Sequence, residues 1–124
     1  MARILVVEDE TVVAMLIEAW LSDIGHETIG PVGTVAAALS LLEKHKVDAA
    51  IVDLSLGGTR SYEIANALRQ KAIPFAWGTG YSAKDIDPDY CNEPLIAKPY
   101  SFDDLTQTLA LLIAEATPAD TPGL

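Results

Sequence analysis

Short apolar runs alternate with amphipathic stretches along almost the whole chain. The apolar runs, several of them rich in β-branched residues, predict five strands, at residues 4–7, 28–32, 49–54, 75–79 and 95–97. Apolar residues that recur three or four positions apart predict four helices, at residues 11–24, 34–44, 61–71 and 101–116. This alternation is typical of a parallel α/β sheet with helices between its strands.

The apolar positions within each predicted helix indicate the face that it buries. In the first helix these positions are Val12, Met15, Leu16, Ala19 and Trp20. In the third and the last helix they are Ile64, Ala65 and Leu68, and Leu105, Leu109 and Leu112. Thr34 is a favoured capping residue, so it predicts the start of the second helix.

The interval between the fourth and fifth strands departs from this rhythm. It contains Gly80, Pro88 and Pro94 and few apolar residues, so we expect at most a turn or two of helix, near residues 83–86. The last residues, 117–124, include two prolines and little to bury, which predicts a disordered tail. We therefore expect a single domain at residues 1–116 and a fourth helix that is short or irregular.

Composition and charge narrow the possible functions. The 124 residues suffice for one domain with a core, and the net charge of −10 argues against nucleic acid as a partner. The sequence contains no apolar run long enough to span a membrane, and its N-terminus lacks the pattern of a signal peptide. Cys91 is the single cysteine, which suits a reducing compartment, and we expect a cytoplasmic protein.

Residues with chemical potential follow four of the predicted strands. Glu8 and Asp9 follow the first, Asp53 ends the third, Thr79 ends the fourth and Lys98 follows the fifth. The carboxyl ends of parallel strands meet at one edge of the sheet, where ligands bind. Two carboxylates about 5 Å apart repel by roughly 3 kcal/mol, and one lysine does not balance three of them. An all-oxygen site of this kind predicts Mg²⁺, with Mn²⁺ as the alternative.

A carboxylate, a divalent cation, a lysine and a hydroxyl are together suited to receive a phosphoryl group in line. In this interpretation Asp53 attacks phosphorus and becomes an acyl phosphate. The metal and Lys98 each hold a non-bridging oxygen, and Thr79 hydrogen-bonds the third only after transfer. Thr79 would then sense the phosphoryl group.

These residues stand in motifs that resemble those of bacterial response-regulator receiver domains. The motifs are VVEDE, IVDLSLGG, GTG and AKPY, and the resemblance covers about residues 3–116. It implies a flavodoxin-like, doubly wound five-stranded parallel sheet in the order 2-1-3-4-5. It also implies that Asp53 is the phosphoacceptor, that Asp9, Asp53 and the carbonyl of Ser55 bind Mg²⁺, and that Glu8 acts through water. The Lys98–Pro99 bond would be cis. The implied partners are a sensor histidine kinase or histidine phosphotransfer protein and a downstream protein.

The segment PFAWGTGYS resembles an alphaproteobacterial subclass of receivers with the signature Pro-Phe-x-Phe-Ala-Thr-Gly-hydrophobic. Trp77 and Gly78 depart from it, and Leu95 stands where many receivers place the aromatic half of their switch. Gly57 likewise stands where proline is common. We hypothesise that residues 80–94 are the main switching element, and that Tyr81 supplies the missing aromatic side chain.

Other interpretations of these residues stay open at the sequence level. Glu8 and Asp9 are also suited to the start of the first helix, and Asp53 to a turn. A Mg²⁺-dependent aspartyl phosphatase uses a similar nucleophile, but Ser55 stands where its acid would be. A flavin-binding protein would need a Ser/Thr/Gly-rich loop after the first strand, where this chain is acidic. A receiver that serves only as an unphosphorylated scaffold is the remaining alternative.

Overall fold

The computed structural model describes residues 1–80 and 86–116 of the chain. Its main sheet is parallel and has five strands in the order β2-β1-β3-β6-β7, as predicted. These strands are β1 (Arg3–Val7), β2 (Glu27–Val32), β3 (Ala49–Asp53), β6 (Phe75–Thr79) and β7 (Leu95–Ala97). The helices are α1 (Thr11–Asp23), α2 (Val35–Lys44), α3 (Tyr62–Gln70) and α4 (Phe102–Ala116).

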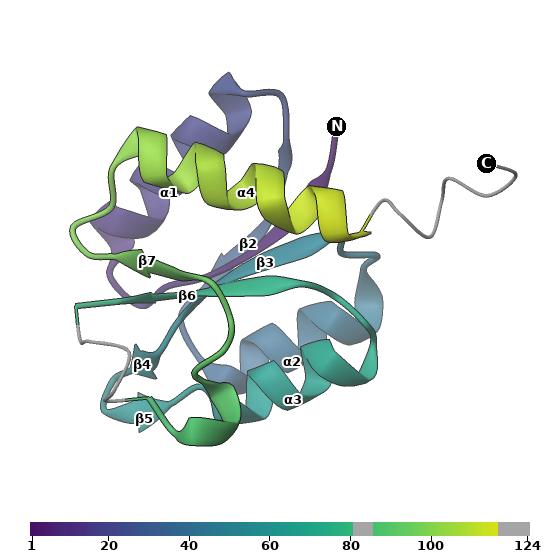
Figure 1. Ribbon diagram of the computed structural model, residues 1–124, viewed down its shortest axis with the longest axis vertical. Helices are drawn as coiled ribbons and strands as arrows, with labels where there is room; N and C mark the ends of the chain where they lie inside the picture. Colours follow the sequence, from purple (N-terminus) through teal and green to yellow (C-terminus); the bar gives the residue numbers. More distant parts are fainter. Residues whose placement is uncertain (81–85, 117–124) are drawn as a thin grey trace, which may run out of the picture.

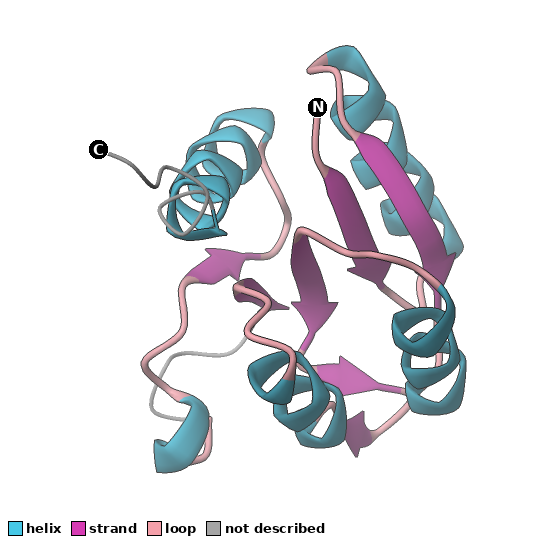
Figure 2. Cartoon of the chain, turned by 90° about the vertical axis from the view of Figure 1, so that its right-hand side faces the viewer, coloured by secondary structure: helices cyan, strands magenta, loops and turns pink. Residues whose placement is uncertain are grey.

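The helices cover both faces of the sheet. In Figure 1, α1 and α4 lie on one side of the strands and α2 and α3 on the other, and Figure 2 shows the same layers from the side. Successive residues of the central strand β3 contribute to opposite cores. Ile51 packs in the cluster that contains Ile17 of α1, whereas Val52 packs in the cluster that contains Ile64 of α3. The whole of β3 is therefore buried, as its uninterrupted apolar run predicts.

Most of the predicted helix faces are confirmed. Ile64, Ala65 and Leu68 of α3 and Leu105, Leu109 and Leu112 of α4 are all buried. The Thr34 side chain accepts a 3.1 Å hydrogen bond from the Ala37 N–H, which confirms it as the cap of α2. Within the described residues, no helix combines the length and the apolar character needed to cross a membrane.

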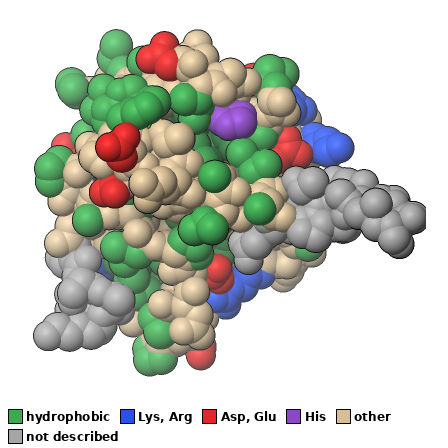
Figure 3. Space-filling model, turned by 45° about the horizontal axis from the view of Figure 1, so that its top comes forward, with side chains coloured by type: hydrophobic (Ala, Val, Ile, Leu, Met, Phe, Trp, Pro, Cys, Tyr) green, Lys and Arg blue, Asp and Glu red, His purple; other side chains and the backbone are tan. Residues whose placement is uncertain are grey.

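The predicted face of α1 is wrong. The helix buries Ala14, Ile17 and Leu21, whereas Val12 is 78% exposed and Met15 62% exposed. The cause is that α1 is apolar on almost all sides, so periodicity alone does not select the stripe that contacts the sheet. The solvent-facing stripe leaves large hydrophobic side chains on the α1–α4 face, which Figure 3 views.

The loop after β3 contains a small hairpin that the sequence pattern did not predict. Strands β4 (Ser55–Leu56) and β5 (Thr59–Arg60) pair antiparallel across Gly57 and Gly58. The φ angles of these glycines are +57° and +89°, values that a two-residue hairpin turn of the primed type requires. This hairpin rises beside the carboxyl end of β3, next to the predicted site.

Between β6 and β7 the described residues contain only a short 3₁₀ turn, Pro88–Tyr90. The helix expected near residues 83–86 lies mostly outside the described residues, and so does the tail at 117–124. Residues 88–93 are held against α3 through Arg69. Its guanidinium binds Glu93 at 3.0 Å, donates a 2.7 Å hydrogen bond to the Asp89 carbonyl and lies 4.6 Å from the centre of the Tyr90 ring.

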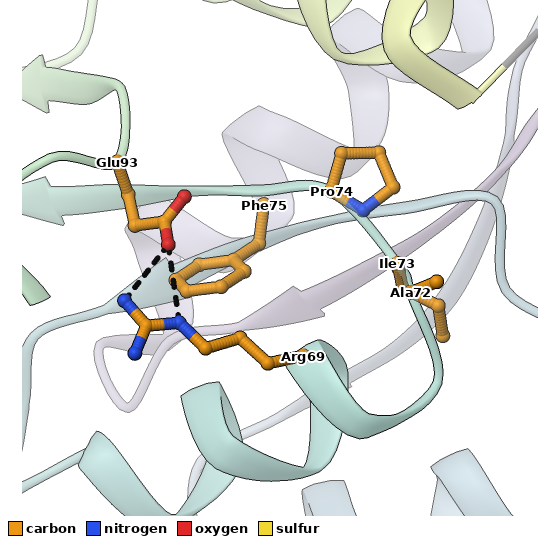
Figure 4. A pocket seen from close by; sticks show the side chains of 6 residues that line it. All are labelled: Arg69, Ala72, Ile73, Pro74, Phe75 and Glu93. Atoms are coloured by element: carbon orange, nitrogen blue, oxygen red, sulfur yellow. Dashed lines mark hydrogen bonds and ion pairs between the residues drawn. The ribbon is translucent and has the colours of Figure 1, made fainter. Parts of the chain in front are cut away.

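Figure 4 shows the Arg69–Glu93 pair at the rim of a shallow pocket of about 290 Å³, with Phe75 behind it. Aromatic contacts also attach residues 88–93 to the interior of the fold. Tyr90 stacks on Tyr62 with ring centres 4.5 Å apart, and the Trp77 indole donates a 2.9 Å hydrogen bond to the Tyr90 carbonyl. A segment with little secondary structure is thus fixed to the fold by side chains.

Candidate phosphorylation and metal site

The predicted site residues converge at the carboxyl edge of the sheet. Strand register places Asp53 beside Gly78, and Thr79 beside Ala97 on the next strand. Glu8 follows β1, and Lys98 follows β7, with its N–H donating to the Thr79 carbonyl at 3.0 Å. Four separate strands therefore deliver the polar groups to one place, as their sequence positions predict.

Glu8, Asp9 and Asp53 form a compact acidic cluster. Each offers one carboxylate oxygen, and these three oxygens all lie within 4.8 Å of one another. Glu8 and Asp53 are buried, whereas Asp9 is exposed. The cluster is therefore open to solvent on the Asp9 side, and its other two carboxylates are largely shielded from water.

Lys98 partly neutralises this cluster. Its Nζ lies 2.9 Å from Asp53 Oδ2, 3.0 Å from Glu8 Oε1 and 3.9 Å from Glu10 Oε1. Burial acts to lower the pKa of Lys98, but the contacts with Asp53 and Glu8 outweigh burial and raise that pKa. Lys98 therefore stays charged and contacts both buried carboxylates.

Burial has the opposite consequence for Glu8. Desolvation raises the pKa of Glu8 from 4.5 to about 7, although the Glu10 N–H and Lys98 both favour the ionised form. The Asp53 charge adds to the upward shift. A carboxyl that is partly protonated near neutral pH is the expected result of burial next to a second carboxylate.

Hydrogen bonds hold both the backbone and the side chain of Asp53, and Ser61, which holds the backbone, was not predicted as a site residue from the sequence. The Ser61 hydroxyl donates a 2.6 Å hydrogen bond to the Asp53 carbonyl, and the Ser55 N–H donates to Asp53 Oδ1 at 3.2 Å. Ser61 is completely buried, which is unusual for a serine placed before a surface helix. The sequence signal for it is weak, because the contact depends on the hairpin that folds residues 54–61 back on themselves.

Asp9 is oriented by the same hairpin. Its Oδ2 accepts a 2.9 Å hydrogen bond from the Gly57 N–H. Proline at this position would lack the N–H group, so the contact requires a residue other than proline at position 57. The exposed carboxylate of the cluster is thus tied to the loop that follows Asp53.

Comparison with known proteins agrees with this geometry. Residues 4–110 match the family described as the response regulator receiver domain. The chain belongs to this family. A receiver domain is a phosphorylation-dependent signalling module and not a conventional enzyme.

Several relatives resemble this receiver domain over most of its length. The transcriptional regulatory protein PdtaR of Mycobacterium tuberculosis is 28% identical over 116 residues, which cover 90% of this chain and 57% of PdtaR. The chain thus spans little more than half the length of that relative. The solution structure of SdrG from Sphingomonas melonis Fr1 is 38% identical, with a TM-score of 0.81, and the match covers 91% of this chain and 97% of SdrG.

Two further structures extend the comparison. A BeF3-activated conformation of SdrG matches with a TM-score of 0.79 over 90% of this chain and 95% of that one. The crystal structure of the response regulator PhyR from Brucella abortus is 27% identical, with a TM-score of 0.84 over 96% of this chain and 50% of PhyR.

The acidic cluster of this receiver domain has the donor chemistry of a hard divalent cation. Its three candidate ligands are all carboxylates, and they lie close enough to share one ion. One lysine leaves their charge incompletely balanced. The cis Lys98–Pro99 peptide bond is also as the family resemblance implies.

Proposed function

We propose that Asp53 is the phosphoacceptor of this receiver domain and that its donor is a phosphohistidine of a sensor kinase or phosphotransfer protein. The observation that carries the proposal is the 2.9 Å contact between Lys98 and Asp53 Oδ2 within the acidic cluster. Glu8 also contacts Lys98, but Asp53 is the member of the cluster that ends the central strand. The BeF3-activated conformation of SdrG supports phosphorylation as the signal.

Each residue of the site has a distinct role in this proposal. One Asp53 carboxylate oxygen attacks phosphorus. The Ser55 N–H holds the side chain through Oδ1, and the Ser61 hydroxyl holds the main chain through the Asp53 carbonyl. Lys98 moves from the carboxylate to a non-bridging phosphoryl oxygen. Thr79 is buried at the end of the neighbouring strand β6, and its hydroxyl would bond another phosphoryl oxygen after transfer.

The residues present fit Mg²⁺, with Mn²⁺ as the alternative. Asp9, Asp53 and the Ser55 carbonyl would hold the ion directly, and Glu8 would hold it through water. When bound, the ion supplies positive charge that offsets the carboxylates and the incoming phosphoryl group. Asp9 would have to share its Oδ2 between the ion and the Gly57 N–H, or release the latter.

The exposed apolar stripe of α1 is proposed as the docking surface for the histidine donor. A pocket of about 300 Å³ brings Met15 beside Glu8 and Asp9, and a second of about 350 Å³ brings Leu16 beside Lys98. The stripe therefore lies next to the site at two points, beside the acidic cluster and beside Lys98. A donor helix with an apolar face next to its histidine would cover the stripe and bring its phosphoryl group to Asp53.

We further propose that this receiver domain belongs to the alphaproteobacterial subclass with the Pro-Phe-x-Phe-Ala-Thr-Gly signature. It would act in the cytoplasm on a downstream protein. The similarity to SdrG and PhyR supports it. Leu95 lacks the aromatic side chain that forms half of the switch in many receivers. We therefore propose that the signal passes from Thr79 into residues 80–94. The Trp77–Tyr90 hydrogen bond links strand β6 to the described part of that segment.

Incubation with acetyl phosphate and Mg²⁺ tests the proposed function. The wild-type chain should gain one acid-labile phosphoryl group, as an acyl phosphate is, and Asp53→Asn should gain none. Asp48→Asn is the matched control, because Asp48 lies at the opposite end of strand β3. Its Oδ2 accepts a 2.8 Å hydrogen bond from the Arg3 N–H. Full labelling of Asp53→Asn, or none of the wild type, would refute the assignment.

A further inference from the structure

Tyr100 carries a buried hydroxyl that the proposed mechanism does not yet use. The residue follows Pro99, and its ring packs in the α1–α4 core cluster with Ala76 and Leu105. Only 9% of the residue is exposed, and its hydroxyl oxygen is fully buried without a hydrogen-bond partner among the described residues. Burying a hydroxyl without a hydrogen-bond partner costs free energy, so this hydroxyl is expected to find a partner in another state of the protein.

The space for this hydroxyl exists because residue 78 is glycine. A Cβ added at Gly78 would overlap the Tyr100 hydroxyl and come within 2.7 Å of the ring carbon that bears it. Every other residue type at position 78 would therefore displace the ring. The glycine and the tyrosine fit together as a pair across the end of strand β6.

Strand register brings the hydroxyl close to the phosphoacceptor. Asp53 and Gly78 are paired positions of neighbouring parallel strands, so their Cβ directions point to the same face. Since strands are spaced about 5 Å apart, the hydroxyl that fills the Gly78 position lies roughly one strand spacing from the Asp53 side chain. Lys98 Nζ, which contacts Asp53, also lies 5.8 Å from the centre of the Tyr100 ring.

The surroundings keep this hydroxyl protonated. Burial, followed by the negative charges of Glu8, Asp53 and Glu10, raises the pKa of Tyr100 far above its ordinary value. Tyr100 therefore presents a hydrogen-bond donor beside an acidic cluster. An oxygen of a group attached to Asp53 would satisfy that donor, directly or through one water molecule.

We propose that Tyr100 is an additional positioning residue of the phosphorylation site, whose hydroxyl gains its acceptor among the oxygens of phosphorylated Asp53. The inference rests on the proposed phosphorylation of Asp53 and adds to it. The unpaired hydroxyl disfavours the unphosphorylated state, and its hydrogen bond stabilises the phosphorylated one. Tyr100 thereby lengthens the lifetime of the phosphorylated form.

Tyr100→Phe removes the hydroxyl and keeps the ring, so it isolates this effect. In the full chain with Mg²⁺, the affinity for beryllofluoride, measured by titration calorimetry, should fall about fivefold, the value of one buried hydrogen bond. The half-life of the acetyl-phosphate-labelled protein should shorten by a similar factor. Urea unfolding without beryllofluoride should show equal or greater stability, since an unpaired hydroxyl has been removed.

Leu112→Val, in the same core cluster but on the last turns of α4, is the matched control. It should lower stability while leaving beryllofluoride affinity unchanged. Unchanged affinity in Tyr100→Phe would overturn the inference, and so would a loss of stability in the absence of beryllofluoride, because the hydroxyl would then already be paired. Gly78→Ala, which displaces the same hydroxyl, should also weaken beryllofluoride binding, and unchanged binding there would count against the inference. Failure of the wild-type chain to bind beryllofluoride or accept phosphate would instead refute the proposed function.

Discussion

The ammonium group of Lys98 lies 2.9 Å from Asp53 Oδ2, at the edge where β3 and β7 deliver these two residues. The same ammonium group contacts Glu8 at 3.0 Å. Lys98 is thus the main compensating charge for two buried carboxylates. Among the described residues, the charge balance of these two carboxylates therefore depends mainly on Lys98.

Lys98→Met should lower the free energy of unfolding by about 1–3 kcal/mol in a metal chelator, because it leaves buried carboxylates unpaired. Mg²⁺ should restore part of that loss by supplying the missing positive charge. Urea unfolding with and without Mg²⁺ measures both effects. Lys46→Met, at an exposed position, is the control and should change neither value. Equal destabilisation by the two substitutions would argue against a charge-balancing role for Lys98.

The contribution of Glu8 to the stability of the metal-free protein should fall as the pH rises from about 4.5 through about 7. The folded state holds the Glu8 proton more tightly than the unfolded state, because burial raises the pKa of Glu8 from 4.5 to about 7. Its stabilising contribution is therefore complete below the unfolded value and is lost as the pH rises through the folded value. Urea unfolding in a chelator between pH 4 and pH 8 measures this slope.

Glu8→Gln should flatten that part of the pH profile, since glutamine does not titrate. Glu18→Gln, at an exposed position on α1, should leave it intact. A slope that survives in Glu8→Gln would assign the titration to another group.

Met15→Asp should slow phosphotransfer from a phosphohistidine donor protein by about tenfold or more, because it places a charge in the proposed apolar contact. Labelling by acetyl phosphate should be unaffected, since the small donor needs no docking surface. Leu111→Asp on α4 is the matched control, because Leu111 is 64% exposed and Met15 is 62% exposed. Radiolabel transfer from the same donor to the three proteins distinguishes the outcomes. Equal rates for Met15→Asp and Leu111→Asp would move the docking surface elsewhere.

Thr79→Ala should leave phosphorylation of Asp53 intact but weaken the response of residues 86–94. In the wild type, beryllofluoride with Mg²⁺ should slow amide exchange in this segment and shift the Trp77 indole N–H signal, because that group bonds the Tyr90 carbonyl. NMR exchange measurements on both proteins test the route. The same change in both, or a change confined to other segments, would contradict a switch through Thr79 and leave the family assignment intact.

The sequence by itself determined the strands of the main sheet, the four helices between and after them, and most of the residues that meet at the site. Glu8, Asp53, Thr79 and Lys98 each stand at the end of a strand, and parallel strands present such positions at one edge. That inference needs only the alternation of apolar runs and helical stretches. The buried faces of α3 and α4 were equally predictable, because Ile64, Ala65 and Leu68 in α3 and Leu105, Leu109 and Leu112 in α4 recur at helical spacing, although Leu111 of α4 is exposed.

Only the tertiary structure decided which stripe of α1 is buried. Both Met15 and Ile17 are apolar, and the packing of the helix against β1 and α4 selects the second. The same holds for contacts between distant positions, such as the Gly57 N–H with Asp9, 48 residues away. The fit of Tyr100 beside Gly78 likewise follows from strand register and chain direction, which local periodicity does not encode.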